Sequence, residues 1–173
     1  KINSVRRVIG VSTQSTKRER KGNYGTTKKL ADDVFMASDL DFTIVKPTLV
    51  YGPGSKGLFA KIFSLIDKLP IIPIIGSGEY RMQPIHVDDV VTALCNIPLK
   101  KETIHKTYDL AGATRLTFNE LIKTSLDVLQ QKKPIIHVPY FACYSGIRAL
   151  SIITKKPPVT ADNILGLIQE TQI

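Results

Sequence analysis

Short segments rich in β-branched residues alternate along this chain with longer segments whose apolar residues recur at helical spacing. The strand-like segments cover residues 5–12, 42–45, 71–75, 85–87, 106–110 and 134–138. The helical patterns cover residues 24–38, 58–68, 88–96, 117–130, 140–153 and 160–169. Strands that are separated by helices usually pair in parallel, because the helix carries the chain back to the starting end of the sheet. The alternation therefore predicts an α/β fold around a parallel sheet, with a small, mostly helical subdomain in the last third.

Local signals define the ends of several of these elements. Thr117 and Glu120 have the Thr-x-x-Glu spacing of a capping box. Asp88 is expected to cap the helix that follows it, and Pro47 to stop the strand over residues 42–45. The apolar side of the helix over residues 24–38 consists of Leu30, Val34 and Ala37.

The charge of the chain is concentrated at one end. Its formal net charge is +9, and residues 1–29 hold nine basic residues and one acidic residue. A basic segment can bind nucleic acid, an anionic surface or a small molecule that bears phosphate, or it can be a solvated loop. Residues 17–21 contain no aromatic side chain on which a base could stack. We therefore favour the solvated loop, and the pattern argues against nucleic acid.

Cysteine content and hydropathy restrict the class of protein. The two cysteines, Cys95 and Cys143, are too few for a disulfide scaffold, so we expect both to be buried thiols in a reducing compartment, the cytoplasm. No stretch approaches the roughly 20 uninterrupted apolar residues of a transmembrane helix, so no transmembrane segment is predicted. The histidines are scattered without the spacing of metal ligands, so no metal site is predicted.

Residues 52–57 read Gly-Pro-Gly-Ser-Lys-Gly and match the G-x-G-x-x-G pattern of a dinucleotide-binding turn. Two features favour a plain glycine loop instead. The preceding strand is expected to end at Pro47, several residues before the first glycine. Pro53 lacks the main-chain N–H that a pyrophosphate would need at this point.

A tyrosine and a lysine four residues apart offer a catalytic pair. Tyr24 and Lys28 would share one face of the predicted helix. A nearby ammonium favours the phenolate form of a tyrosine, which makes that tyrosine a usable acid or base. Thr13, at the end of the first strand, can hydrogen-bond the same substrate oxygen. Such pairs also arise by chance, and it is the order of strand, loop, helix and strand around this one that favours catalysis.

Four segments together resemble a known family. They are VIGVST at residues 8–13, YGTTK at 24–28, FTIVKPTLVYGPG at 42–54 and QPIHVDDVVTAL at 83–94. They resemble the extended and atypical short-chain dehydrogenases/reductases, the NAD(P)-dependent epimerase/dehydratase family. Within that family they are similar to the branch of the respiratory complex I accessory subunit that has this fold.

The resemblance implies a Rossmann-like fold with a small C-terminal substrate domain, and it implies a role for each residue of the site. Thr13 would polarise a substrate carbonyl or hydroxyl, Tyr24 would be the acid/base, and Lys28 would hold the nicotinamide ribose. The main chain that would meet the nicotinamide end of NAD or NADP surrounds three residues: Pro47, Thr48 and Leu49.

The resemblance also implies that this chain is the C-terminal portion of a longer protein, because the family's glycine-rich phosphate turn and first βαβ units are absent. Residues 1–55 would be the C-terminal half of the NAD(P)-binding domain. Residues 56–173 would mix a substrate-binding subdomain with the last elements of the sheet. Met82 stands where nucleotide-sugar enzymes of the family usually place an arginine, which argues against a nucleotide-sugar substrate.

Three functions remain open at this point. We favour an NAD(P)-dependent enzyme that transfers hydride at an oxygen-bearing carbon of a small-molecule substrate. The alternatives are a non-catalytic, dinucleotide-binding accessory subunit and a basic nucleic-acid-binding protein. Arg81 and His86 are candidate substrate contacts, although a surface arginine and a hydrogen-bonded structural histidine are the favoured interpretations. The apolar stretch at residues 140–153 predicts a buried helix or a surface for a second copy or a larger complex.

Overall fold

The computed structural model describes residues 5–17, 22–55 and 57–142, which form two compact units. The sheet unit contains the described residues 5–17, 22–55 and 83–114. The second unit contains the described residues 57–82 and 115–142. The chain passes from the sheet unit to the second unit after residue 55 and returns at residue 83 to supply the last strand of the sheet. Of the helices expected at 140–153 and 160–169, all but residues 140–142 lie outside the described residues.

Three parallel strands, β1 (Arg7–Val11), β2 (Asp41–Pro47) and β7 (Lys106–Leu110), form the sheet in the order β1-β2-β7. Val11 pairs with Val45, which pairs with Tyr108, so the carboxyl ends of the strands meet at one edge. The central strand β2 is buried along most of its length, as expected for a parallel strand that is covered on both faces. β2 ends at Pro47, two positions beyond the predicted end. Proline has no main-chain N–H to donate to a neighbouring strand, but it can still occupy the last position of a strand.

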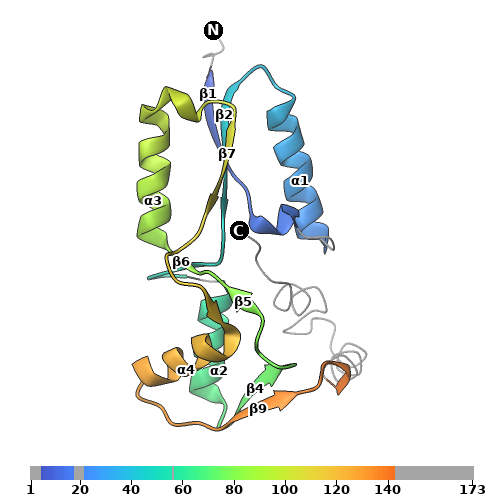
Figure 1. Ribbon diagram of the computed structural model, residues 1–173, viewed down its shortest axis with the longest axis vertical. Coiled ribbons are helices and arrows are strands. Elements are labelled where there is room, and N and C mark those ends of the chain that lie inside the picture. The colour runs from blue at the N-terminus through green and yellow to red at the C-terminus, as the bar shows by residue number, and fades with distance from the viewer. Residues whose placement is uncertain (1–4, 18–21, 56, 143–173) are drawn as a thin grey trace. The chain divides into compact units, whose positions relative to one another are not determined.

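Two helices, α1 (Gly22–Met36) and α3 (Val87–Asn96), lie on opposite sides of this sheet (Figure 1). The apolar side of α1 is its exposed side, since Leu30 and Val34 are 60% and 70% exposed. The buried residues of α1 are Gly25 and Asp32. Two short 3-10 helices, η2 (Ile97–Leu99) and η3 (Lys101–Thr103), connect α3 to β7.

A short parallel pair, β3 (Val50–Tyr51) with β6 (Ile85–His86), leads directly into α3. His86 is the cap of α3: its backbone is extended, and its Nδ1 accepts a hydrogen bond from the Asp88 N–H at 3.3 Å. The predicted cap at Asp88 is therefore wrong by two positions. The helix starts immediately after β6, which leaves Asp88 in the first turn, where its charge still faces the positive end of the helix dipole.

The described residues of the second unit include two helices, α2 (Leu58–Lys68) and α4 (Phe118–Val128), and two small sheets. Its sheets pair β4 (Ile72–Ile75) in parallel with β9 (Ile135–Val138), and β5 (Arg81–Met82) antiparallel with β8 (Leu116–Thr117). The buried side chains of α2 are Phe59, Ile62 and Ile66, which recur at the helical spacing that predicted this element.

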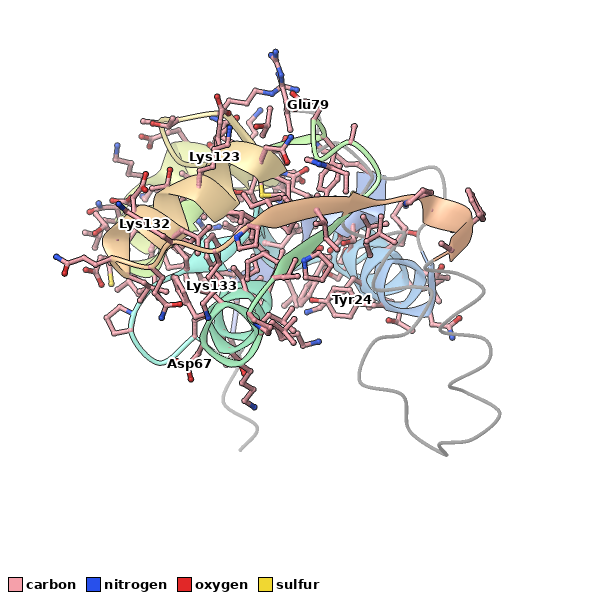
Figure 2. All side chains as sticks on the ribbon, turned by 90° about the horizontal axis from the view of Figure 1, so that it is seen from below. Tyr24, Asp67, Glu79, Lys123, Lys132 and Lys133 are labelled. Atoms are coloured by element: carbon pink, nitrogen blue, oxygen red, sulfur yellow. The ribbon has the colours of Figure 1, made fainter. Side chains whose placement is uncertain are left out.

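The helix ends of the second unit are closed by side chains. The predicted capping box is present: the Glu120 N–H donates to Thr117 Oγ1 at 3.1 Å, and the Thr117 N–H donates to Glu120 Oε2 at 2.7 Å. This main-chain hydrogen bond, with the Thr117 hydroxyl, lowers the pKa of Glu120. At the C-terminal end of α2, Lys133 donates to the Ile66 carbonyl and lies 3.4 Å from the Asp67 carbonyl (Figure 2 labels Lys133 and Asp67). A cation at this end complements the helix dipole.

Candidate functional site

The candidate site lies at the carboxyl edge of the three-stranded sheet. β1 ends before Thr13, and β2 ends at Pro47, which pairs with the last residue of β7, Leu110. The Thr48 N–H donates to the Leu110 carbonyl at 2.8 Å, and Leu49 accepts a hydrogen bond from the Ile85 N–H at 3.0 Å. The predicted cofactor segment 47–49 is thus fixed by main-chain bonds beside the end of β1. In open α/β sheets, ligands bind outside the carboxyl ends of the strands.

Thr13 is held in a tight turn just beyond β1. Its hydroxyl accepts a hydrogen bond from the Ser15 N–H at 3.3 Å. Its carbonyl accepts hydrogen bonds from both the N–H and the hydroxyl of Thr16, which begin the 3-10 helix η1 (Gln14–Lys17). The side chain is half-buried. The turn therefore places the Thr13 hydroxyl at the sheet edge without burying it.

Lys28 joins α1 to the same place. Its Nζ donates to the Val11 carbonyl at 3.1 Å, two residues before Thr13. Tyr24, which Figure 2 labels, lies one turn earlier on the same helix and is 61% exposed. The structure therefore brings Lys28 to the end of β1, and Tyr24 lies on the preceding turn of α1.

A buried polar network behind this edge was not predicted from the sequence. Lys46, in β2, is nearly fully buried, and its Nζ lies 2.9 Å from Asp32 Oδ2 on α1. The same ammonium donates to Thr16 Oγ1 at 3.0 Å. The sequence feature that indicates this network is a lysine inside an otherwise apolar strand. A charge that is buried in this way requires a partner of opposite charge or hydrogen-bonding groups.

Gln14 extends the network from η1. Its Nε2 donates to the Lys46 carbonyl at 3.0 Å and to Asp109 Oδ1 at 2.7 Å. Asp109, near the end of β7, also forms an ion pair with Lys17. Side chains from β1–η1, β2 and β7 are thus joined at the edge where the strands end.

Two polar atoms at this edge, the Ser12 hydroxyl and Gln14 Oε1, are buried and make no hydrogen bond within the part of the chain that the structure describes. Buried hydroxyls normally find a partner, so an orphan atom here is consistent with a ligand group that completes the edge. Together with the exposed Tyr24 and the ammonium of Lys28, the donors present fit the hydroxyl-rich ribose of a nicotinamide dinucleotide.

The two candidate substrate contacts fall in different units. His86, in the sheet unit, caps α3 and makes an edge-to-face contact with Tyr51 at a centroid distance of 5.1 Å. These contacts are those of a structural histidine. Arg81, in the second unit, is exposed on β5, where its charge contributes to lowering the pKa of Glu120.

The glycine loop after β3 has a structural explanation. Gly52 and Gly54 have positive φ angles of 147° and 74°. A Cβ on Gly52 would lie 2.5 Å from Val87 Cγ1. Backbone conformation and close packing therefore account for Gly52 without a bound phosphate.

Cys95 is the one cysteine within residues 5–17, 22–55 and 57–142. Cys95 is exposed on α3, so its prediction as a buried thiol is wrong: the residue falls on the outer side of the helix, while Val90 is the buried one. Cys143 lies outside these ranges. Within them, no group of three or more His, Cys, Asp or Glu side chains is placed to hold a metal ion. No helix in them has the length and apolar character to cross a membrane.

Comparison with known proteins gives consistent matches. The NAD dependent epimerase/dehydratase family matches residues 9–111 of this chain. Ceramide reductase of Caulobacter vibrioides is 28% identical over 161 residues, which are 88% of this chain and 49% of that protein. The mitochondrial NADH dehydrogenase (ubiquinone) 1 alpha subcomplex subunit 9 of Arabidopsis thaliana is 25% identical over 115 residues, which are 65% of this chain and 28% of that protein.

A solved structure shares the fold. The dTDP-glucose 4,6-dehydratase of Bacillus anthracis, in complex with NAD, matches with a TM-score of 0.65 at 20% identity, over 77% of this chain and 49% of that one. The chain therefore has the Rossmann-like α/β fold of NAD-binding epimerases and dehydratases, and it spans about half the length of that structure and of ceramide reductase. The family match runs from β1 to the end of β7 and includes the whole carboxyl edge of the sheet. This chain belongs to the NAD dependent epimerase/dehydratase family.

Proposed function

We propose that the intact protein is an NAD(P)-dependent oxidoreductase, epimerase or dehydratase that acts at an oxygen-bearing carbon of a small molecule. The observation that carries the proposal is the hydrogen bond from Lys28 to Val11 at 3.1 Å. This bond joins the helix that carries Tyr24 and Lys28 to the end of β1, two residues before Thr13 in the chain, and so supports a shared site.

Each of the three side chains has a distinct task. The Thr13 hydroxyl hydrogen-bonds the substrate oxygen, and the Tyr24 hydroxyl gives that oxygen its proton as a carbonyl is reduced. In the reverse direction, Tyr24 takes the proton from an alcohol. The Lys28 ammonium holds the ribose of the dinucleotide. The dinucleotide, NAD or NADP, supplies or accepts the hydride at the substrate carbon.

Replacing Tyr24 by Phe in the full-length protein tests this function. The substitution keeps the ring and removes the hydroxyl. Ceramide-type lipids and dTDP-glucose are the candidate substrates. Nicotinamide absorbance follows a net oxidation or reduction, and loss of substrate follows an epimerase or dehydratase reaction, which leaves the dinucleotide unchanged overall. We expect kcat to fall at least 100-fold while the affinity for NADH stays within about threefold, because general acid–base catalysis contributes about 10²–10⁴-fold. Turnover that is unchanged in the variant contradicts the role of Tyr24.

A second candidate is a non-catalytic accessory subunit that binds a dinucleotide. The similarity to a subunit of mitochondrial NADH dehydrogenase favours it, as does the similarity of these segments to that branch of the family. This candidate predicts that the purified full-length protein carries bound nicotinamide dinucleotide, has no turnover with any of the substrates, and elutes with a larger assembly. Bound-cofactor analysis and size-exclusion chromatography of the native protein separate the two candidates.

We place this activity in the cytoplasm. The exposed thiol of Cys95 supports a reducing compartment, where such a thiol stays reduced. We also propose that the protein binds a small molecule rather than nucleic acid. Of the basic residues near the N-terminal end, Arg7, Lys17 and Lys28 are engaged in contacts within the sheet unit, which leaves them less free to neutralise phosphates.

A further inference from the structure

The helix that presents Tyr24 and Lys28 buries few of its apolar side chains, although Phe35 packs against Gly10 of β1. Only Gly25 and Asp32 are buried in α1, whereas Leu30 and Val34 are largely exposed. Apolar packing is non-directional, and here it is sparse. The position of α1 along the sheet therefore depends strongly on directional polar contacts.

Those contacts come from one line of residues on the helix. Tyr24, Lys28 and Asp32 follow one another at intervals of four and therefore share one face of α1. Lys28 donates to the Val11 carbonyl of β1 at 3.1 Å. One turn later, Asp32 lies 2.9 Å from the Lys46 ammonium of β2. The two contacts fix this face against two adjacent strands.

Lys46 also holds the segment that follows Thr13. Its ammonium donates to Thr16 Oγ1 at 3.0 Å, and its carbonyl accepts from Gln14 Nε2 at 3.0 Å. Thr16 in turn donates to the Thr13 carbonyl. A single buried lysine is thus joined on one side to the helix of Tyr24 and on the other to the turn of Thr13.

We propose that Lys46 and Asp32 are positioning residues of the candidate site. This inference rests on the proposed function. The pair touches neither substrate nor cofactor. It holds α1 against η1 so that the hydroxyls of Tyr24 and Thr13 reach the same substrate oxygen. A displacement of about 1 Å in such a constellation can reduce the rate by about 100-fold.

The proposal differs in a testable way from a purely structural ion pair. A buried ion pair can often be replaced by apolar residues without loss of stability, whereas removal of one partner alone is strongly destabilising. The informative variant is therefore the double substitution Asp32→Leu with Lys46→Met in the full-length protein. It removes both charges and their directional contacts, and it fills the space with apolar atoms.

Three measurements are made on this double variant: the unfolding midpoint, kcat and KM with the substrate that the wild type turns over, and amide hydrogen exchange along α1. We expect a midpoint near that of the wild type, a kcat lowered about 30- to 100-fold with KM changed less than threefold, and faster exchange over residues 24–32 but not in β2. A matched control is Thr103→Val, which removes a buried hydroxyl that Arg7 contacts at 2.6 Å near the opposite, amino edge of the sheet. The control should lower stability and leave kcat unchanged.

Wild-type kcat together with wild-type exchange in the folded double variant overturns the positioning role. If the double variant does not fold, Lys46→Arg takes its place. This variant keeps a cation opposite Asp32. If the ion pair positions α1, the kcat of Lys46→Arg should exceed one third of the wild-type value. A kcat below one tenth of the wild-type value overturns the proposal. Failure of the proposed function is recognised separately, because then the wild type itself lacks turnover and Tyr24→Phe changes nothing.

Discussion

The Lys28 ammonium donates to the Val11 carbonyl at 3.1 Å, and this bond joins the helix of the candidate site to the end of β1. Replacing Lys28 by Met removes a charged donor at the expected ribose position. A hydrogen bond that involves a charged group contributes about 1.5–3 kcal/mol, so we expect the Kd for NADH to rise at least about 10-fold in the full-length protein. Fluorescence titration measures this Kd.

Lys29→Met is the matched control for that experiment. Lys29 is the next residue of α1 and forms an ion pair with Asp33 on the same helix. Removing an exposed pair of this kind changes stability by less than about 1 kcal/mol. The Kd for NADH should stay within twofold of the wild type, and an equal loss of affinity in both variants would show that net charge, rather than the position of Lys28, determines binding.

Gly10 is required by close packing between β1 and α1. A Cβ at this position would lie 3.1 Å and 3.3 Å from two ring carbons of Phe35. Gly10→Val therefore overpacks this contact, and we expect the free energy of unfolding to fall by about 1–3 kcal/mol, as measured by urea denaturation. Adding Phe35→Leu should recover part of the loss, because the smaller side chain makes room. If the second substitution deepens the loss, steric conflict with the ring is not the cause.

Elements with strong local signals could be predicted from the sequence. The helix over residues 58–68 and the strand over 106–110 have the predicted bounds, since their apolar spacing matches one period only. The capping box at Thr117 was also predictable, because its hydrogen bonds join residues three positions apart.

Features that depend on distant residues could not be predicted. The exposed side of α1 looks like a core face in the sequence, but the sheet instead receives Gly25 and Asp32. Asp32 is buried only because Lys46, from the next strand, neutralises it. The cap of α3 was misplaced for a similar reason: the helix start is set by the end of β6, whose pairing with β3 no local pattern reveals.

Substitutions at His86 distinguish a structural role of this residue from a contact with the substrate. As the cap of α3, it accepts from the Asp88 N–H at 3.3 Å. His86→Ala loses this bond and should lower the free energy of unfolding by about 1 kcal/mol, whereas His86→Asn keeps a side chain that can cap and should restore most of it. In an enzyme assay, both variants should retain the wild-type KM. A KM that rises equally in both, with stability unchanged, would identify His86 as a substrate contact.

The capping box of α4 predicts a pH dependence of stability. Hydrogen bonds from Thr117 lower the pKa of Glu120 below its ordinary value of 4.5, so the folded state binds the proton less readily than the unfolded state. The stabilisation is therefore complete above the unfolded pKa and is lost as the pH falls through the lower folded pKa. Glu120→Gln should lower the unfolding midpoint at pH 7, and the difference from the wild type should shrink as the pH is lowered below about 4.5.

Thr117 provides the test of this cause. Thr117→Ala removes the partner hydroxyl and should cost about 1 kcal/mol at pH 7. In the Thr117→Ala background, Glu120→Gln should have a smaller effect at pH 7 than in the wild type, because one of the hydrogen bonds that favour the charged carboxylate is gone. Thermal unfolding of the four proteins between pH 3 and pH 7 measures this coupling. Strictly additive effects across that range would mean that the pH dependence of stability arises from groups other than the capping box.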